Sequence, residues 1–129
     1  MGRCNLEEPP RGSPWDDPLT DAPLVFVDLE MTGLVPAVDR IIEVCAERVR
    51  GDKLEASLTT LVRPDNGTHG NVHVHGIKRE TLESAPTFAM IAKDLLSVID
   101  EGILVAHAAE ADVTFLQTEF ERAGHAKRF

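Results

Sequence analysis

The sequence predicts an α/β fold built around a mixed sheet. Three strand-like segments come first and alternating strand and helix segments follow, the order expected when helices cover a sheet of mixed direction. Hydrophobic residues make up 43% of the 129 residues and charged residues 27%, a balance typical of a folded globular domain. A chain of this length fits one domain with a two-layer core.

The start of the chain does not have the composition of a folded segment. Residues 1–22 contain four prolines among acidic neighbours and almost no apolar pattern. This composition is typical of a flexible leader. We therefore expect the leader to lie outside the fold and the domain to occupy residues 23–129.

Apolar runs and turn residues predict three strands. The continuous apolar run that begins at Leu24 predicts a strand over 24–30 that is covered on both faces. Branched residues predict a second strand over 41–49, and alternating residues predict a third over 54–63. The tight turn at 51–53 makes the second and third strands antiparallel.

The second half of the chain predicts two helices with a strand between them. After an irregular connection over 65–76, Pro86 opens and Gly102 closes a segment with apolar residues at helical spacing. The apolar run at 103–106 predicts a buried strand. A second helical stripe follows and ends at Gly124.

Charge and cysteine content restrict the function. The formal net charge of −9 argues against a broad basic surface for duplex nucleic acid, so any nucleic-acid contact should be small and local. Two cysteines, Cys4 and Cys45, do not form a disulfide framework, which favours a reducing, cytoplasmic compartment. No segment approaches membrane-spanning length, so we expect no membrane partner.

Asp28 and Glu30 are the first residues that suggest chemistry. Side chains two apart on a strand share a face, so both acids project together where the apolar run ends. Adjacent carboxylates repel unless a cation lies between them, and hard divalent ions prefer such oxygen ligands. An isolated Asp-x-Glu is more often a turn-capping acid beside a solvated one, so its context has to decide.

The context resembles the DEDD superfamily of 3′–5′ exonucleases. Residues 26–34 (FVDLEMTGL) resemble its first motif, and residues 39–43 (DRIIE) and 75–77 (HGI) resemble the segments that follow. Residues 105–116 (VAHAAEADVTFL) resemble its second motif, which places Asp112 on the third acid of the family. Taken without the family, Asp112 is a helix-capping acid.

The resemblance implies a ribonuclease H-like mixed sheet and a metal-dependent enzyme that releases nucleoside 5′-monophosphates from 3′ ends. Its catalytic and metal-binding residues would be Asp28, Glu30 and Asp112, holding two divalent cations, Mg²⁺ or Mn²⁺. Its substrate-binding residues would be Glu30, Thr32, Gly33 and His107. The implied partners are a single-stranded nucleic-acid 3′ end and a DNA polymerase subunit. More of the chain resembles the proofreading epsilon subunit of bacterial DNA polymerase III than the oligoribonucleases.

The chain departs from the family pattern in three ways. Ala108 replaces the usual Asn and Ala111 the usual aromatic residue. The third motif, which supplies a histidine base and a fourth acid, is absent, and His125 lies too close to Asp112 to replace it. The fold would then be C-terminally truncated. Two alternatives stay open: a non-catalytic module that binds a nucleic-acid end or a polymerase, and a fragment of a longer enzyme.

Three histidines in one predicted loop suggest a further alternative, a zinc site. His69, His73 and His75 lie within seven residues of each other, but cysteine partners and paired ligand spacing are both missing. We therefore interpret His75 as part of the His-Gly-Ile turn that the resemblance implies.

Overall fold

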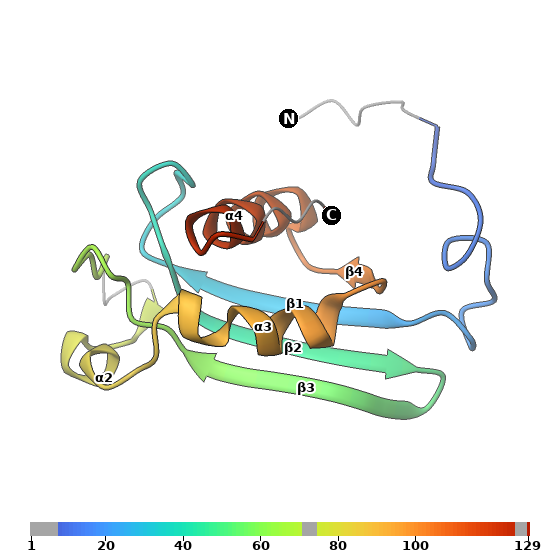
Figure 1. Cartoon of the computed structure of the whole chain (residues 1–129), viewed down its shortest axis with the longest axis horizontal. Coiled ribbons are helices and arrows are strands. Elements are labelled where there is room, and N and C mark those ends of the chain that lie inside the picture. The colour runs from blue at the N-terminus through green and yellow to red at the C-terminus, as the bar shows by residue number, and fades with distance from the viewer. Residues whose placement is uncertain (1–7, 71–74, 126–128) are drawn as a thin grey trace.

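A single four-stranded sheet forms the centre of the computed structural model, which describes residues 8–70, 75–125 and 129 (Figure 1). The strand order is β3-β2-β1-β4. β1 pairs antiparallel with β2 and parallel with β4, and β2 pairs antiparallel with β3, which confirms the mixed sheet. The strands are β1 (Leu24–Met31), β2 (Ile41–Arg50), β3 (Lys53–Leu61) and β4 (Ile103–Val105).

The helices are α2 (Arg79–Glu83), α3 (Phe88–Ile99) and α4 (Ala109–Arg122). Helices α3 and α4 confirm the two predicted helical stripes, although α4 begins four residues before Val113, the first residue of its stripe. Helix α2 is an addition to the prediction, because its five residues bury only one side chain, Leu82, and so carry no helical stripe. None of the helices that the structure describes is long and apolar enough to span a membrane.

Both α3 and α4 lie on one face of the sheet (Figure 1). Along β1, Val25, Val27 and Leu29 point into the core beneath these helices. On the alternate positions Phe26 is 45% exposed and Asp28 is also exposed. The expectation that this strand is covered on both faces is therefore wrong, because within the described residues no helix covers the second face.

The core fixes helix α4 against β1. Phe115, Leu116 and Phe120 of α4 are almost fully buried and pack with the core residues of β1, β2 and α3. Phe120 meets Phe88 of α3 edge to face, with ring centroids 5.0 Å apart. Because truncating a buried Phe costs about 3–5 kcal/mol, this contact holds α4 firmly in place. The beginning of α4 consequently lies close to the end of β1.

Residues 8–22 form turns without a helix or strand. The last of them attach to the sheet: the Arg50 guanidinium donates to the Asp21 carbonyl at 2.7 Å, and Ala22 is only 1% exposed. The Ile103 N–H then donates to the Pro23 carbonyl at 2.8 Å, which brings β4 alongside the start of β1.

Candidate active site

Asp28 lies on the open face of the sheet. Its side chain is exposed and lines a cavity of about 530 Å³ together with residues of β1, β2, β4 and the segment after β4. His107 lines the same cavity, so two of the predicted site residues come together there. The wall between them is apolar and acidic, and consists of Phe26, Cys45, Glu47 and Val105 among others.

Asp112 reaches the same region from the first turn of α4. Only 9% of Asp112 is exposed, and this burial raises the pKa of its carboxyl group above the ordinary value. The negative charge of Asp28 raises that pKa further, while His107 acts in the opposite direction. The structure thus places Asp28, His107 and Asp112 within electrostatic reach of one another, although they come from three separate segments.

Glu30 lies where β1 gives way to a loop. It is half-buried, stands opposite Glu43 of β2, and is followed by a shift in the strand register before Met31. Such a bulge bends the strand and redirects the side chains beside it. Among the described residues, no three His, Cys, Asp or Glu side chains lie close enough together to enclose a metal ion.

The donor set nevertheless suits a hard divalent cation. Asp28, Glu30 and Asp112 offer carboxylate oxygens, the ligands that Mg²⁺ and Mn²⁺ prefer. The repulsion between Asp28 and Asp112 that raises the Asp112 pKa is the repulsion a cation between them would relieve. Without a cation between them, the carboxylates of Asp28 and Asp112 repel each other and stay apart.

Thr32 and Gly33 begin a loop that Asp39 closes. The Thr32 hydroxyl donates to Asp39 at 3.0 Å and accepts from the Arg40 N–H at 2.9 Å, and the Thr32 N–H donates to the Arg40 carbonyl. A Cβ at Gly33 would lie 2.5 Å from Asp39 Oδ2, so only glycine fits there. No described residue accepts a hydrogen bond from the Gly33 N–H, whereas both donors of Thr32 serve the loop.

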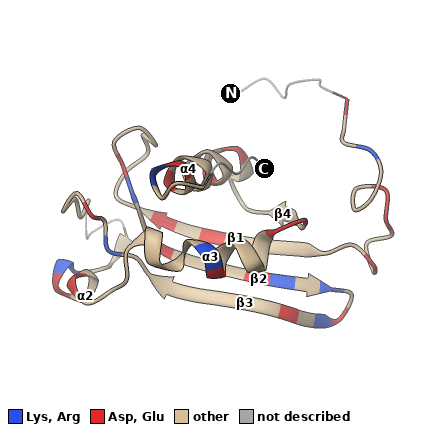
Figure 2. Ribbon diagram, in the orientation of Figure 1, with Lys and Arg blue, Asp and Glu red and all other residues tan. Residues whose placement is uncertain are grey.

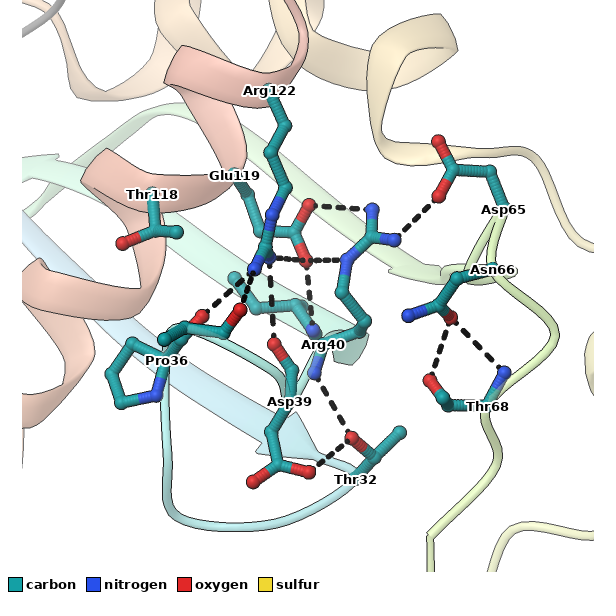
Figure 3. Close-up of polar contacts among 12 residues, drawn as sticks. Thr32, Pro36, Asp39, Arg40, Asp65, Asn66, Thr68, Thr118, Glu119 and Arg122 are labelled. Carbon is teal, nitrogen blue, oxygen red and sulfur yellow. Dashed lines mark hydrogen bonds and ion pairs between the residues drawn. The ribbon is translucent and has the colours of Figure 1, made fainter.

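A buried ion network joins this loop to α4 (Figure 3). Arg40 Nε and Nη2 donate to the two carboxylate oxygens of Glu119 at 2.6 and 2.9 Å, and the Ile41 N–H donates to Glu119 as well. Arg40 also pairs with Asp65. One turn after Glu119, Arg122 donates to the carbonyls of three loop residues, namely Pro36, Ala37 and Asp39.

The sequence prediction did not include this network, but a signal for it exists. Glu119 is an acid in the middle of an apolar helical stripe, three positions after Leu116 and next to Phe120, and it is only 1% exposed. A buried acid requires a cationic partner. Arg40, directly before the apolar start of β2, is the cationic partner of Glu119.

The histidine rings hold the loop that precedes α2. His75 Nδ1 accepts from the Ile77 N–H at 2.9 Å, so Nε2 carries the proton that it donates to the His69 carbonyl at 3.0 Å. His69 Nε2 in turn donates to the Ile77 carbonyl at 2.7 Å. These bonds occupy both nitrogens of His75 in closing its turn. His73, the third member of the zinc alternative, lies outside the described residues.

Comparison with known proteins decides the family. A protein-family model described as Exonuclease (RNase_T) matches residues 25–128. The chain belongs to this exonuclease family. The match includes both segments that carry Asp28, Glu30 and Asp112.

Relatives of the exonuclease family match most of this chain. DNA polymerase III PolC-type of Thermotoga maritima is 33% identical over 103 residues, covering 79% of this chain and 8% of its own length. DNA polymerase III subunit epsilon of Aquifex aeolicus is 26% identical over 125 residues, covering 96% of this chain and 61% of its own length. The chain thus spans under a tenth of the PolC-type relative and less than two thirds of the epsilon relative.

Solved structures confirm the fold. Exonuclease I in its apo form superposes with a TM-score of 0.71 at 18% identity, covering 81% of this chain and 26% of that one. E. coli exonuclease I in complex with a dT13 oligonucleotide gives the same TM-score of 0.71, covering 81% of this chain and 25% of that one. The expected ribonuclease H-like arrangement is confirmed by this likeness.

The two departures from the exonuclease pattern lie at the start of α4. Ala108 is the N-cap of the helix and provides no side-chain hydrogen bond to the free N–H groups there. Ala111 is exposed and lines a second cavity of about 530 Å³, which Leu34, 89% exposed, faces from the β1–β2 loop. Ala108 lines the same cavity, so both substituted positions border it.

Proposed function

We propose that the chain is a metal-dependent 3′–5′ exonuclease domain that hydrolyses nucleic-acid 3′ ends to nucleoside 5′-monophosphates. The observation that carries the proposal is that Asp28, from the middle of β1, lies within electrostatic reach of the buried Asp112 of α4, in a chain of the exonuclease family. Like charges brought together at a cavity are costly, and a divalent cation offsets that cost.

In this proposal Asp28, Glu30 and Asp112 hold two divalent cations, Mg²⁺ or Mn²⁺. Cations bound there supply charge stabilisation for the oxygens of the phosphate under attack. Asp28 would hold a cation together with Asp112, because the charge of Asp28 is close enough to raise the Asp112 pKa. Asp112, which is only 9% exposed, would offer its carboxylate to a cation from a buried position.

The remaining predicted residues receive the terminal nucleotide. The Gly33 N–H, which no described residue engages, is available to a sugar or phosphate oxygen. Thr32 acts through the loop, because its hydroxyl closes the turn with Asp39. His107 lines the Asp28 cavity and offers a ring nitrogen to the substrate, and Glu30 faces the sugar from the end of β1.

We infer DNA as the substrate and a polymerase subunit as the partner. Two relatives that match the chain are named DNA polymerase III PolC-type and DNA polymerase III subunit epsilon, and one solved structure of similar fold holds a dT13 oligonucleotide. The net charge of −9 disfavours extended contact with duplex, so a single-stranded 3′ end is the form of DNA that fits.

Release of label from a 3′-labelled single strand tests the proposal. The chain should release mononucleotides in Mg²⁺ or Mn²⁺ and none in EDTA. Asp28→Asn keeps the side-chain shape and should slow release on the order of 100-fold or more, because it removes a charged ligand from the site. Asp94→Asn, which removes an exposed acid from α3, is the matched control and should leave the rate unchanged.

A non-catalytic module that binds a 3′ end is the second candidate. Ala108 and Ala111 favour it, because they withdraw a polar and an aromatic side chain from beside Asp112. Metal-dependent binding of the strand without release of label would establish this module and reject hydrolysis. Equal release by wild type and Asp28→Asn would reject the assignment of Asp28.

A further inference from the structure

Two of the 13 Lys and Arg residues of this acidic protein, Arg63 and Arg79, line one cavity beside α2. Residues 63–79 contain three Lys or Arg residues and one Asp, against a net charge of −9 for the whole chain. Figure 2 shows Lys and Arg on α2 and on the chain that follows β3. Arg63 and Arg79 line a cavity of about 280 Å³ there, together with Thr68, His69, Leu82 and Glu83.

Backbone carbonyls, not acids, hold the two arginines. Arg63 Nε donates to the Ala85 carbonyl at 3.3 Å, and Arg79 Nη2 donates to the Gly67 carbonyl at 3.4 Å. Within the described part of the chain neither arginine forms an ion pair. Asp65, an acid on the cavity wall, is already paired with Arg40. Glu83 also lines the cavity, but no described carboxylate forms an ion pair with either arginine.

Local hydrogen bonds hold residues 66–69, which border the cavity. Asn66 accepts from the Thr68 N–H and hydroxyl at 3.0 and 2.8 Å, which forms a local turn. His69 and Ile77 bond across the base of the loop. A cavity with a fixed wall and two donors of the Arg type suits a phosphate group, which accepts the paired N–H groups of a guanidinium.

This corner touches the candidate active site. Gly70 has a φ of +77°, and a Cβ there would lie 2.4 Å from the Thr32 carbonyl oxygen, so the loop abuts the first residue after β1. Arg40 reinforces the junction, because it bonds Thr32 through its N–H and Asp65 through its guanidinium. A strand whose 3′ end meets Asp28 and Glu30 has this cavity next to it.

We propose that the Arg63–Arg79 cavity binds a backbone phosphate of single-stranded DNA upstream of the nucleotide being removed. This assignment rests on the proposed function for the direction of the strand. It explains how an acidic chain retains its substrate with a small, local contact. The terminal nucleotide lies with the acids, and the arginines engage only a longer strand.

Binding measured without hydrolysis tests the site. The affinity of the full chain for dT12 is measured in EDTA at several salt concentrations. Each phosphate contact to a single strand contributes about 0.7 to the slope of log K against log salt, so losing the one proposed contact in Arg63→Gln/Arg79→Gln should lower the slope by about 0.7. Affinity for thymidine 5′-monophosphate should not change, since one nucleotide does not reach the cavity.

Matched variants separate the site from net charge and from folding. Lys53→Gln removes a charge at the β2–β3 turn, at the other end of the sheet from α2, and should leave the slope unchanged (Figure 1). If the double Gln variant unfolds, Arg63→Lys/Arg79→Lys replaces it and should retain the wild-type slope. A fall in slope of about 0.7 or more in Arg63→Gln/Arg79→Gln, with no fall in Lys53→Gln, supports the proposal. A smaller fall in the double variant overturns it.

The test is independent of catalysis. A fall in the salt slope together with equal label release by wild type and Asp28→Asn would keep the phosphate site and reject the exonuclease mechanism. An unchanged slope together with a slow Asp28→Asn variant would reject the phosphate site and keep the mechanism.

Discussion

Arg40 and Glu119 form a buried ion pair across 79 positions of the chain, with two hydrogen bonds between guanidinium and carboxylate. The side chains are 8% and 1% exposed. Because Arg40 also bonds Thr32 and Arg122 holds the carbonyls of the same loop, the pair ties helix α4 to the end of β1. The helix carries Asp112 and the strand carries Asp28 and Glu30, so the network sets the spacing of the acids.

Removing one member of this pair should destabilise the protein strongly. Glu119→Leu leaves Arg40 buried with only Asp65 as partner, and we expect the free energy of unfolding in urea to fall by about 3–5 kcal/mol. Arg40→Met/Glu119→Leu removes both charges and should recover most of that loss. Glu121→Ala, an exposed position on the same helix, is the control. A loss of the same size at Glu121 would contradict this account.

Asp112→Asn should stabilise the cation-free protein while removing a proposed metal ligand. The raised pKa of Asp112 means that the folded state holds this proton more tightly than the unfolded chain, so stability present at acidic pH is lost as pH rises through the folded-state pKa. Asn has no carboxyl group to ionise, so the variant does not lose this stability as the pH rises. In EDTA the Tm of the variant should exceed that of wild type at pH 7, and the gap should narrow toward pH 4. A lower Tm at pH 7 would contradict this prediction.

Ala108→Asn should strengthen the start of α4. Ala108 is the N-cap but has no side-chain acceptor, and an Asn there accepts a hydrogen bond from a free N–H of the first turn. We expect a gain of about 1 kcal/mol in unfolding free energy. Ala111→Asn, placed inside the same first turn, should give no gain because Asn is a weaker helix former than Ala. Equal gains at both positions would argue against capping.

Gly33→Ala should distort the loop after β1. The new Cβ would lie within 2.5 to 2.6 Å of the Asp39 carboxylate, which would have to leave Thr32. We expect a cost of about 1–3 kcal/mol in stability and weaker binding of a 3′ end. Gly33→Ala/Asp39→Ala removes the steric conflict, so its loss should be smaller than the sum of the two single losses. Simple additivity in a double-mutant cycle would show that the contact is not the cause.

The periodicity of apolar residues was enough to predict the sheet and its two main helices. The turn at Gly51 predicted the pairing of β2 with β3, and the two helical stripes predicted α3 and α4. The covering of β1 was predicted wrongly, because Leu24–Val27 is continuous in apolar residues although only alternate ones face the core. A run of four apolar residues is compatible both with a strand buried on two faces and with a strand that exposes one Phe on its open face.

The candidate acids could be predicted from the sequence, whereas the ion network of Arg40 and Glu119 was not predicted. Asp28 and Glu30 stand two apart on one strand, so their common direction follows from the backbone alone. Glu119 and Arg40 come into contact only when α4 docks. The sequence around either residue does not indicate which residue is its partner. The roles of Thr32, Gly33 and His107 toward a substrate stay predictions, because the structure describes their neighbours in the protein alone.

The 79-residue separation of Arg40 and Glu119 also bears on the order of folding. Closing a loop of this length costs entropy that only the completed core can offset. The β1–β2 and β2–β3 hairpins need only local contacts, so we expect them to form before α4 docks. Until then Asp112 is far from Asp28, and the loop after β1 lacks the Arg122 contacts. A chain still emerging from the ribosome therefore carries Asp28 before Asp112 has docked near it, so these two proposed cation ligands come together only in the finished fold.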